Sequence, residues 1–185
     1  MVKFNNSGLS ALSEVSNIKL SLFVLNTSND DQSDKDKPRY SDELEEACKK
    51  LVSSFSELEK ISGKLEMISL KLHNLSSLDV SNSDDSDVSK CEDAVFRTWR
   101  ISQFADNAAE ISNMYKKELL CKRCIVENAA HVDLIKDEDD VTLLSEKCRD
   151  ILTTYSSCWL HQPFINECIE ILHLEGMLFE SGHIS

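Results

Sequence analysis

One apolar seam restricts the fold of this chain more than any other feature. Its members follow one another at steps of 4, 3, 4, 3, 3, 4, 3, 4 and 3 residues, a spacing that places side chains on one face of an α-helix and is typical of a coiled coil. They are Leu44, Cys48, Leu51, Phe55, Leu58, Ile61, Leu65, Ile68, Leu72 and Leu75. We therefore expect a helix about 50 Å long that needs another helix against its apolar face.

The rest of the composition also favours helices over strands. The 185 residues include only four glycines, two prolines and 6% aromatic residues, so a sheet-rich protein would lack its turn residues and its preferred side chains. The sequence predicts an all-α fold, an elongated antiparallel helical bundle with coiled-coil-like long helices.

Two polar stretches interrupt the helical pattern. Both are rich in Ser, Asn and Asp and hold too little apolar surface to fold, so we expect disordered acidic loops there. The predicted organisation is an N-terminal helix (1–26), a linker (27–40), the long helix (41–76), an acidic loop (77–94) and a C-terminal helical region (95–183).

The C-terminal region predicts three further helices. One runs from about 102 to 130, a second begins near Val141 and is stopped by Pro163, and the last covers about 166–181. Gly182 follows the last helix and suits a left-handed residue at its end.

The charge narrows the possible partners. Thirty-three acids against twenty bases give a formal charge of −13, which repels phosphate backbones, so we expect no direct nucleic-acid binding. Residues 136–185 hold ten of the acids and three bases, which suits a basic partner surface. Since no run of about 18 apolar residues occurs, we expect a protein that is neither secreted nor membrane-spanning.

Seven cysteines raise a chemical alternative. Most occupy apolar positions of helical patterns, where a thiol behaves as a small hydrophobic side chain in a reducing compartment. Cys121 and Cys124 form a C-x-x-C unit, but it lies within a predicted helix and lacks the further pair that a zinc site needs. A structural role is favoured, and a metal-binding or redox protein stays open as the alternative.

No constellation in the sequence predicts catalysis. Phosphate-binding glycine loops and the nucleophile-elbow motif are missing, so we expect no enzyme activity, catalytic residue or cofactor. His161, His173 and His183 do not have the spacing of a metal triad, and His161 and His183 are better explained as helix caps. We predict no metal site.

Four segments occur in the order of one known family. They are Val95–Trp99 (VFRTW), Met114–Arg123 (MYKKELLCKR), Trp159–Phe164 (WLHQPF) and Leu172–His183 (LHLEGMLFESGH). The chain resembles the cyclin-dependent kinase 2-interacting protein family, mainly over residues 95–183. We expect the N-terminal helical extension of that family to be short or absent here.

The resemblance implies a non-catalytic adaptor of genome maintenance, nuclear or also cytoplasmic. It implies binding to cyclin-dependent kinase 2 and to the cell-division-cycle kinase that fires replication origins, with a role in checkpoint signalling. It also implies membership of an AAA ATPase complex that matures pre-60S ribosomes and remodels replisomes, beside a second small helical subunit.

Candidate partner-binding residues come from these segments. They are Trp99, Tyr115, Lys116, Lys117, Lys122, Arg123, Trp159, Leu160, His161, Pro163, Phe164, His173, Leu174, Met177 and Leu178. For both tryptophans a core position is the alternative, and the basic residues could instead pair with acids on neighbouring helices. A coiled coil that self-associates through the seam is a further alternative function.

Overall fold

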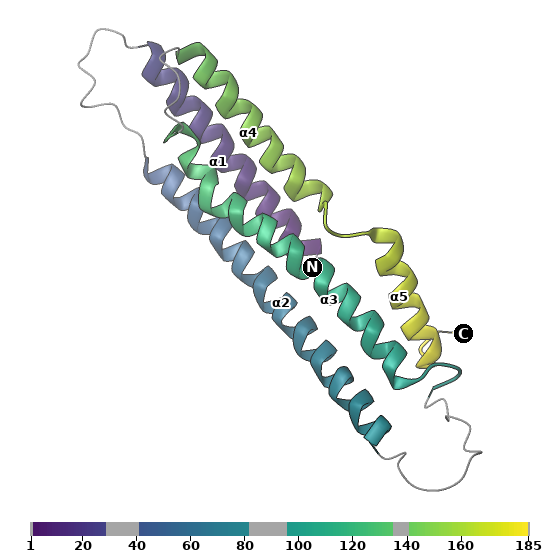
Figure 1. The fold of residues 1–185 in the computed structure, drawn as a ribbon. Coiled ribbons are helices and arrows are strands. Elements are labelled where there is room, and N and C mark those ends of the chain that lie inside the picture. Colours follow the sequence, from purple (N-terminus) through teal and green to yellow (C-terminus); the bar gives the residue numbers. More distant parts are fainter. Residues whose placement is uncertain (1, 29–40, 82–95, 135–140, 185) are drawn as a thin grey trace, which may run out of the picture. The chain divides into compact units, whose positions relative to one another are not determined.

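The computed structural model describes residues 2–28, 41–81, 96–134 and 141–184. Within these ranges all regular structure is helical (Figure 1), which confirms the all-α helical bundle. The elements are α1 (Val2–Ser28), α2 (Asp42–Ser81), α3 (Ile101–Asn128), the 3₁₀ helix η1 (Ala129–Leu134), α4 (Val141–His161) and α5 (Glu167–Glu180).

The chain forms two compact units. Unit 1 consists of Met1–Glu59 and Leu119–Gln162, and unit 2 of Lys60–Glu118 and Pro163–Ser185. Both α2 and α3 therefore contribute one part to each unit, whereas α1 and α4 belong to unit 1 and α5 to unit 2.

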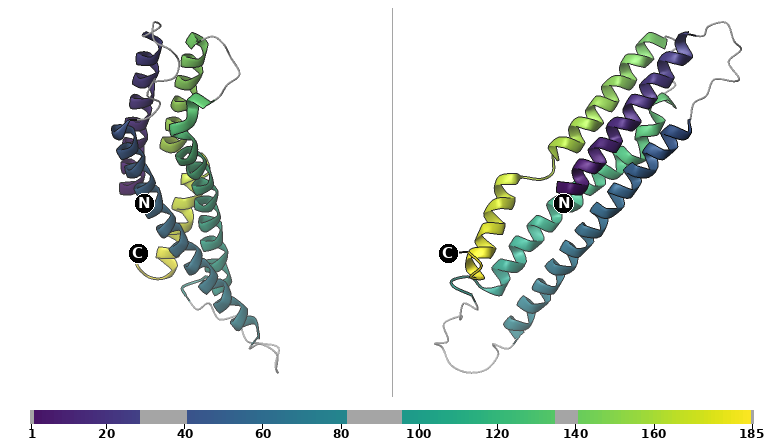
Figure 2. Two further views of the ribbon diagram at one scale, coloured as in Figure 1. Left: turned by 90° about the vertical axis from the view of Figure 1, so that its left-hand side faces the viewer. Right: turned by 180° about the vertical axis from the view of Figure 1, so that it is seen from behind.

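Unit 1 is a helical bundle with a closed core. Helices α1 and α4 lie side by side, and the parts of α2 and α3 in this unit pack with them (Figures 1 and 2). Apolar side chains at helical spacing meet in the middle, so each helix buries one stripe. The buried residues are Ala11, Leu12, Val15, Leu44, Ala47, Leu51, Phe55, Leu58, Ile125, Ala129 and Trp159.

The first helix extends beyond its apolar repeat. That repeat runs from Leu12 to Leu25, whereas α1 spans Val2–Ser28. Asn5 is buried and Phe4 packs against the core, so the first turn is stabilised by tertiary contacts that a periodicity analysis cannot detect.

The start of α2 shows how sequence fixes a helix terminus. Ser41 accepts a hydrogen bond through its hydroxyl from the Leu44 amide at 3.1 Å, which satisfies one free donor of the first turn. Asp42, Glu43 and Glu45 lie in that turn, where the helix dipole favours negative charge.

Unit 2 buries less of the seam than the pattern predicted. Leu44, Leu51 and Leu58 are buried in unit 1, but Ile68 and Leu75 in unit 2 are about half exposed. Helix α2 also continues to Ser81, so the predicted break at 76 is wrong for residues 77–81. The remaining parts of the predicted linker and acidic loop, residues 29–40 and 82–94, lie outside the described residues.

The last helix agrees with its predicted signals. Asn166 caps α5 by accepting a hydrogen bond from the Ile169 amide, and Gly182 has a φ of 78° after the C-cap Ser181. The amides of Gly182 and His183 donate to the carbonyls of Phe179 and Leu178, which is a Schellman motif.

In the part of the chain that the structure describes, no helix combines sufficient length with sufficient apolar character to cross a bilayer.

Candidate partner-binding surface

Trp159 near the end of α4 is a core residue of unit 1. Its side chain has no exposed surface, and its indole Nε1 donates a hydrogen bond to the carbonyl of Asn5 at 3.0 Å. Gly8 on α1 lies directly against the ring, where an added Cβ would overlap the indole Cζ2. Of the two explanations that the sequence allowed, a core residue or a buried interface anchor, Trp159 occupies the core position in unit 1.

Lys122 is a second candidate that serves the core of unit 1. Only 2% of its surface is exposed. The ammonium group donates to the carbonyl of Trp159 at 3.1 Å and lies 4.8 Å from the centre of the indole ring. A cation thus satisfies a carbonyl of the last turn of α4, where the helix dipole favours positive charge.

The other basic candidates lie on the surface and pair with acids of α2. In unit 1, Arg123 forms an ion pair with Glu59. In unit 2, Lys116 forms one with Glu66 at 3.0 Å, and Lys117 is exposed. Lys116 and Arg123 therefore follow the predicted alternative of pairing with acids on a neighbouring helix. Solvated ion pairs of this kind add little stability.

The end of α4 exposes two further candidates. Leu160 and His161 are exposed in unit 1. The helix stops because Gln162 adopts a φ of 47° and Pro163 provides no backbone N–H. In unit 2, Pro163 and Phe164 are exposed as well.

In unit 2 a buried carboxylate attaches the C-terminal end of α5 to the segment before α3. Glu180 accepts hydrogen bonds from the Thr98 amide and hydroxyl, both at 2.6 Å, and from the Trp99 amide at 3.0 Å. We call this group, made of Glu180, Thr98 and Trp99, the clasp.

The clasp changes the acidity of its carboxyl group. Burial acts to raise the pKa of Glu180, but the three hydrogen bonds and the nearby charge of Arg97 outweigh it, so the pKa lies below the ordinary value. Hydrogen bonds to the charged form have this effect in general. Glu180 therefore stays ionised while the clasp is formed.

Trp99 completes the attachment with an apolar contact. Its ring lies over Gly176 of α5, where an added Cβ would be 2.6 Å from the indole Cη2. The ring also meets Phe104 edge to face with 5.4 Å between centroids. Trp99 thus fixes the start of α3.

Two more polar contacts hold α5 against α3. The Tyr115 hydroxyl donates to a carboxylate oxygen of Glu170. Burial is the larger cause that raises the pKa of Tyr115, and this hydrogen bond is the second. His173 Nε2 lies 2.8 Å from a carboxylate oxygen of Glu110. The face of α5 that carries Glu170, His173, Gly176 and Glu180 is therefore the face that packs within unit 2.

The remaining face of α5 exposes apolar side chains. Of the predicted residues, Leu174 and Leu178 are exposed and Met177 is partly buried. Two residues that sequence reasoning missed, Ile171 and Leu172, are even more exposed. The signal was ambiguous because α5 has apolar residues on all sides, and only the structure shows which side is covered.

Among the described residues, no group of three or more His, Cys, Asp and Glu side chains could hold a metal ion. Cys121 is partly buried and Cys124 is exposed. They lie on the same helix rather than at a helix N-terminus, which is the position that activates a redox thiol.

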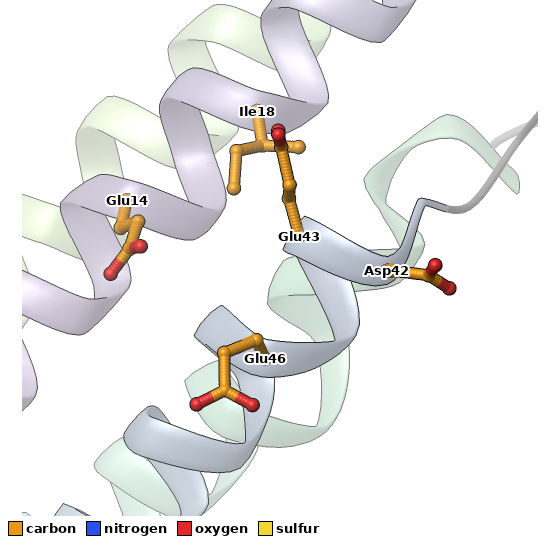
Figure 3. Close-up of a pocket in the computed structure, with 5 residues that line it drawn as sticks. All are labelled: Glu14, Ile18, Asp42, Glu43 and Glu46. Atoms are coloured by element: carbon orange, nitrogen blue, oxygen red, sulfur yellow. The ribbon is translucent and has the colours of Figure 1, made fainter.

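Unit 1 has a shallow cleft between α1 and α2. Glu14 and Ile18 line it from α1, and Asp42, Glu43 and Glu46 from α2. Figure 3 shows that Glu43 extends toward Ile18 while Asp42 points away from Glu14 and Glu46. The carboxylates do not converge on one point, so the cleft is acidic without being a metal site.

Comparison with known proteins identifies the family. No family model matches the sequence. The proteins named "Cyclin-dependent kinase 2-interacting protein" of Homo sapiens and Bos taurus are 31% and 30% identical to it over 187 aligned positions. Each alignment covers 97% of this chain and 80% of the relative, and the Xenopus laevis protein matches at 30% over the same shares. The chain therefore belongs to the cyclin-dependent kinase 2-interacting protein family.

Proposed function

We propose that this protein is a non-catalytic adaptor of the cell cycle that binds cyclin-dependent kinase 2. The observation that carries the proposal is the relationship over nearly the whole chain to proteins named for that interaction. A helical bundle that offers exposed side chains rather than a converging set of reactive groups suits such a role.

The finer part of the proposal follows the family resemblance. The protein would act in the nucleus in DNA replication and checkpoint signalling, and would also bind the cell-division-cycle kinase that fires origins. It would be a subunit of an AAA ATPase complex for pre-60S maturation and replisome remodelling, together with a second small helical protein.

Unit 2 supplies the surface that we assign to the kinase. Phe164, Leu174 and Leu178 expose between 42% and 46% of their area, and an apolar side chain gains free energy when a partner removes it from water. Trp159 and Lys122 are left out of this surface because they are buried in unit 1.

The test uses purified cyclin-dependent kinase 2 and the whole chain. We expect the kinase to be captured by the wild-type protein and capture to fall at least tenfold with Leu174→Asp and Leu178→Asp combined, since each carboxylate would be buried without a partner. The matched control is Val52→Asp on α2 in unit 1, because Val52 is exposed to a similar degree at 49%.

The outcomes separate the two parts of the proposal. No capture by folded wild-type protein overturns kinase binding. Equal capture by the double variant and the Val52→Asp control overturns the assigned surface alone. Mass spectrometry of proteins that copurify from native cells tests the AAA ATPase assignment, which fails if no ATPase subunit is recovered in stoichiometric amount.

A further inference from the structure

Helix α5 presents to solvent an apolar stripe with one glutamate at its middle. The residues stand at positions i, i+3, i+4, i+7, i+10 and i+11, the spacing of a single helix face, and we call this surface the α5 ridge. It consists of Cys168, Ile171, Leu172, Glu175, Leu178 and Phe179. Leu172 is 68% exposed and Ile171 53% exposed, so the most apolar part of the ridge is also the least covered.

The contacts on the opposite side of α5 fix the orientation of the ridge. His173 meets Glu110, Gly176 meets the ring of Trp99, and Glu180 closes the clasp. These contacts occur at three successive turns, so the helix cannot rotate to bury the ridge without breaking all of them. The ridge is thus a preformed surface, and binding there requires little reorganisation.

The charge around the ridge indicates the chemistry of its partner. Residues 163–185 include four glutamates and no lysine or arginine. Glu175 is exposed and lies at the middle of the stripe, between Leu172 and Leu178. A positive charge reaches the ridge at one end, where the guanidinium of Arg97 lies 4.7 Å from the centre of the Phe179 ring.

The charge also argues against a second copy of this chain as the partner at the α5 ridge. Two copies would each carry −13, and pairing two ridges would bring two Glu175 carboxylates into one apolar interface, where like charges repel. The acidic stretches 82–95 and 135–140 hold nine acids and two lysines together, so they do not complement the ridge either.

We propose that the α5 ridge binds one amphipathic helix of a partner protein, whose apolar stripe carries a Lys or Arg at its middle that pairs with Glu175. This inference rests on the proposed adaptor role and specifies its partner. Ridge and helix interlock over about four turns, with apolar side chains at i, i+3, i+4 and i+7 of the partner as anchors.

The experiment is a fluorescence-anisotropy titration of the full chain into a labelled synthetic helix. The first peptide has leucines along one face, a single Lys at the centre of that face and uncharged polar residues elsewhere. A second peptide differs only by Glu in place of the Lys. We expect the Lys peptide to bind at least about fivefold more tightly, the effect of replacing an attraction by a repulsion at a partly buried site.

Four variants, two of them matched controls, locate the binding. Leu172→Ser should weaken binding of the Lys peptide about tenfold, because one large apolar contact is lost. Leu120 on α3 is 61% exposed, and Leu120→Ser should have no effect on this binding. Glu175→Lys should reverse the preference toward the Glu peptide. Glu43→Lys in the acidic cleft changes the net charge equally and should leave the preference unchanged.

Several results would overturn the proposal that the α5 ridge binds a partner helix. They are equal affinity for the two peptides, no effect of Leu172→Ser in a protein of unchanged helicity, or equal effects of Glu43→Lys and Glu175→Lys. If sedimentation shows a dimer of the wild-type protein and Leu172→Ser abolishes it, a second copy of this chain binds the ridge and the proposed partner helix is overturned. Kinase capture is measured separately. If the protein binds the Lys peptide but captures no kinase, the kinase assignment is contradicted while helix binding at the α5 ridge stands.

Discussion

Glu180 and Thr98 are separated by 82 residues in sequence, yet two donors of Thr98 bind the two oxygens of the Glu180 carboxylate. The amide reaches Oε2 and the hydroxyl reaches Oε1, each at 2.6 Å. One side chain at the last turn of α5 therefore orders the backbone that leads into α3. A single residue near the C-terminus controls how a preceding helix begins.

Replacing Glu180 by Gln should loosen this segment without unfolding the protein. The amide side chain keeps one acceptor but loses the charge that strengthens all three hydrogen bonds. We expect faster hydrogen exchange at the amides of Thr98 and Trp99, measured by NMR, with exchange in unit 1 unchanged. The Glu175→Gln variant serves as a control because Glu175 is an exposed acid of the same helix; equal acceleration in both would contradict the clasp.

The clasp should also open in acid. The pKa of Glu180 is lower in the folded protein than in the unfolded chain, so the folded state binds fewer protons and gains stability from this group. That contribution is complete above the ordinary glutamate pKa of about 4.3 and disappears as the pH falls through the lowered value. An NMR titration should show protection of the Thr98 amide lost in that range, and protection that persists to lower pH would refute the assignment.

Replacing Gly8 in unit 1 and Gly63 in α2 by alanine should change the free energy of unfolding in opposite directions. Gly8→Ala places a methyl group into the Trp159 ring and should lower the free energy of unfolding by about 1–3 kcal/mol. Gly63→Ala meets nothing within 4 Å and should raise it by about 0.5–1 kcal/mol through helix propensity. Urea denaturation compares the two; unchanged stability of the Gly8→Ala variant would contradict the packing of Gly8 against Trp159, and a loss of stability in the Gly63→Ala variant would contradict the open space at Gly63.

Tyr115 should ionise at unusually high pH. Burial and the hydrogen bond to Glu170 favour the neutral phenol in the folded protein and raise its pKa above the ordinary value of about 10. Its contribution to stability is therefore present below pH 10 and is lost as the pH rises through the raised value. In absorbance titrations at about 295 nm, Tyr115→Phe should remove only the high-pH part of the signal; loss of signal near pH 10 would show that Tyr115 is unperturbed.

The sequence predicted the helices well because their signals are local. The step pattern from Leu44 to Leu75 located α2, and Gly182 marked the C-terminal end of α5. The prediction failed at Ser81, where α2 continues beyond its apolar repeat. Tertiary contacts stabilise the first turn of α1, and no turn residue stops α2 at 76.

The candidate surface was harder to predict because exposure depends on packing between distant segments. Trp159 and Leu172 are both large apolar residues of predicted helices, and nothing in their sequence neighbours separates a core residue from an exposed one. Trp159 is buried because Gly8 and Asn5, more than 150 residues earlier, lie against it. Such a pairing leaves no periodic signal in the sequence.

The positions of the two tryptophans give this protein a built-in pair of optical reporters. Trp159 lies in the core of unit 1 and Trp99 against Gly176 in unit 2. Each unit thus has its own intrinsic fluorophore, because the chain contains no other tryptophan. Replacing one tryptophan by Phe leaves emission that follows a single unit, so a denaturation curve can distinguish two units that melt together from two that melt independently.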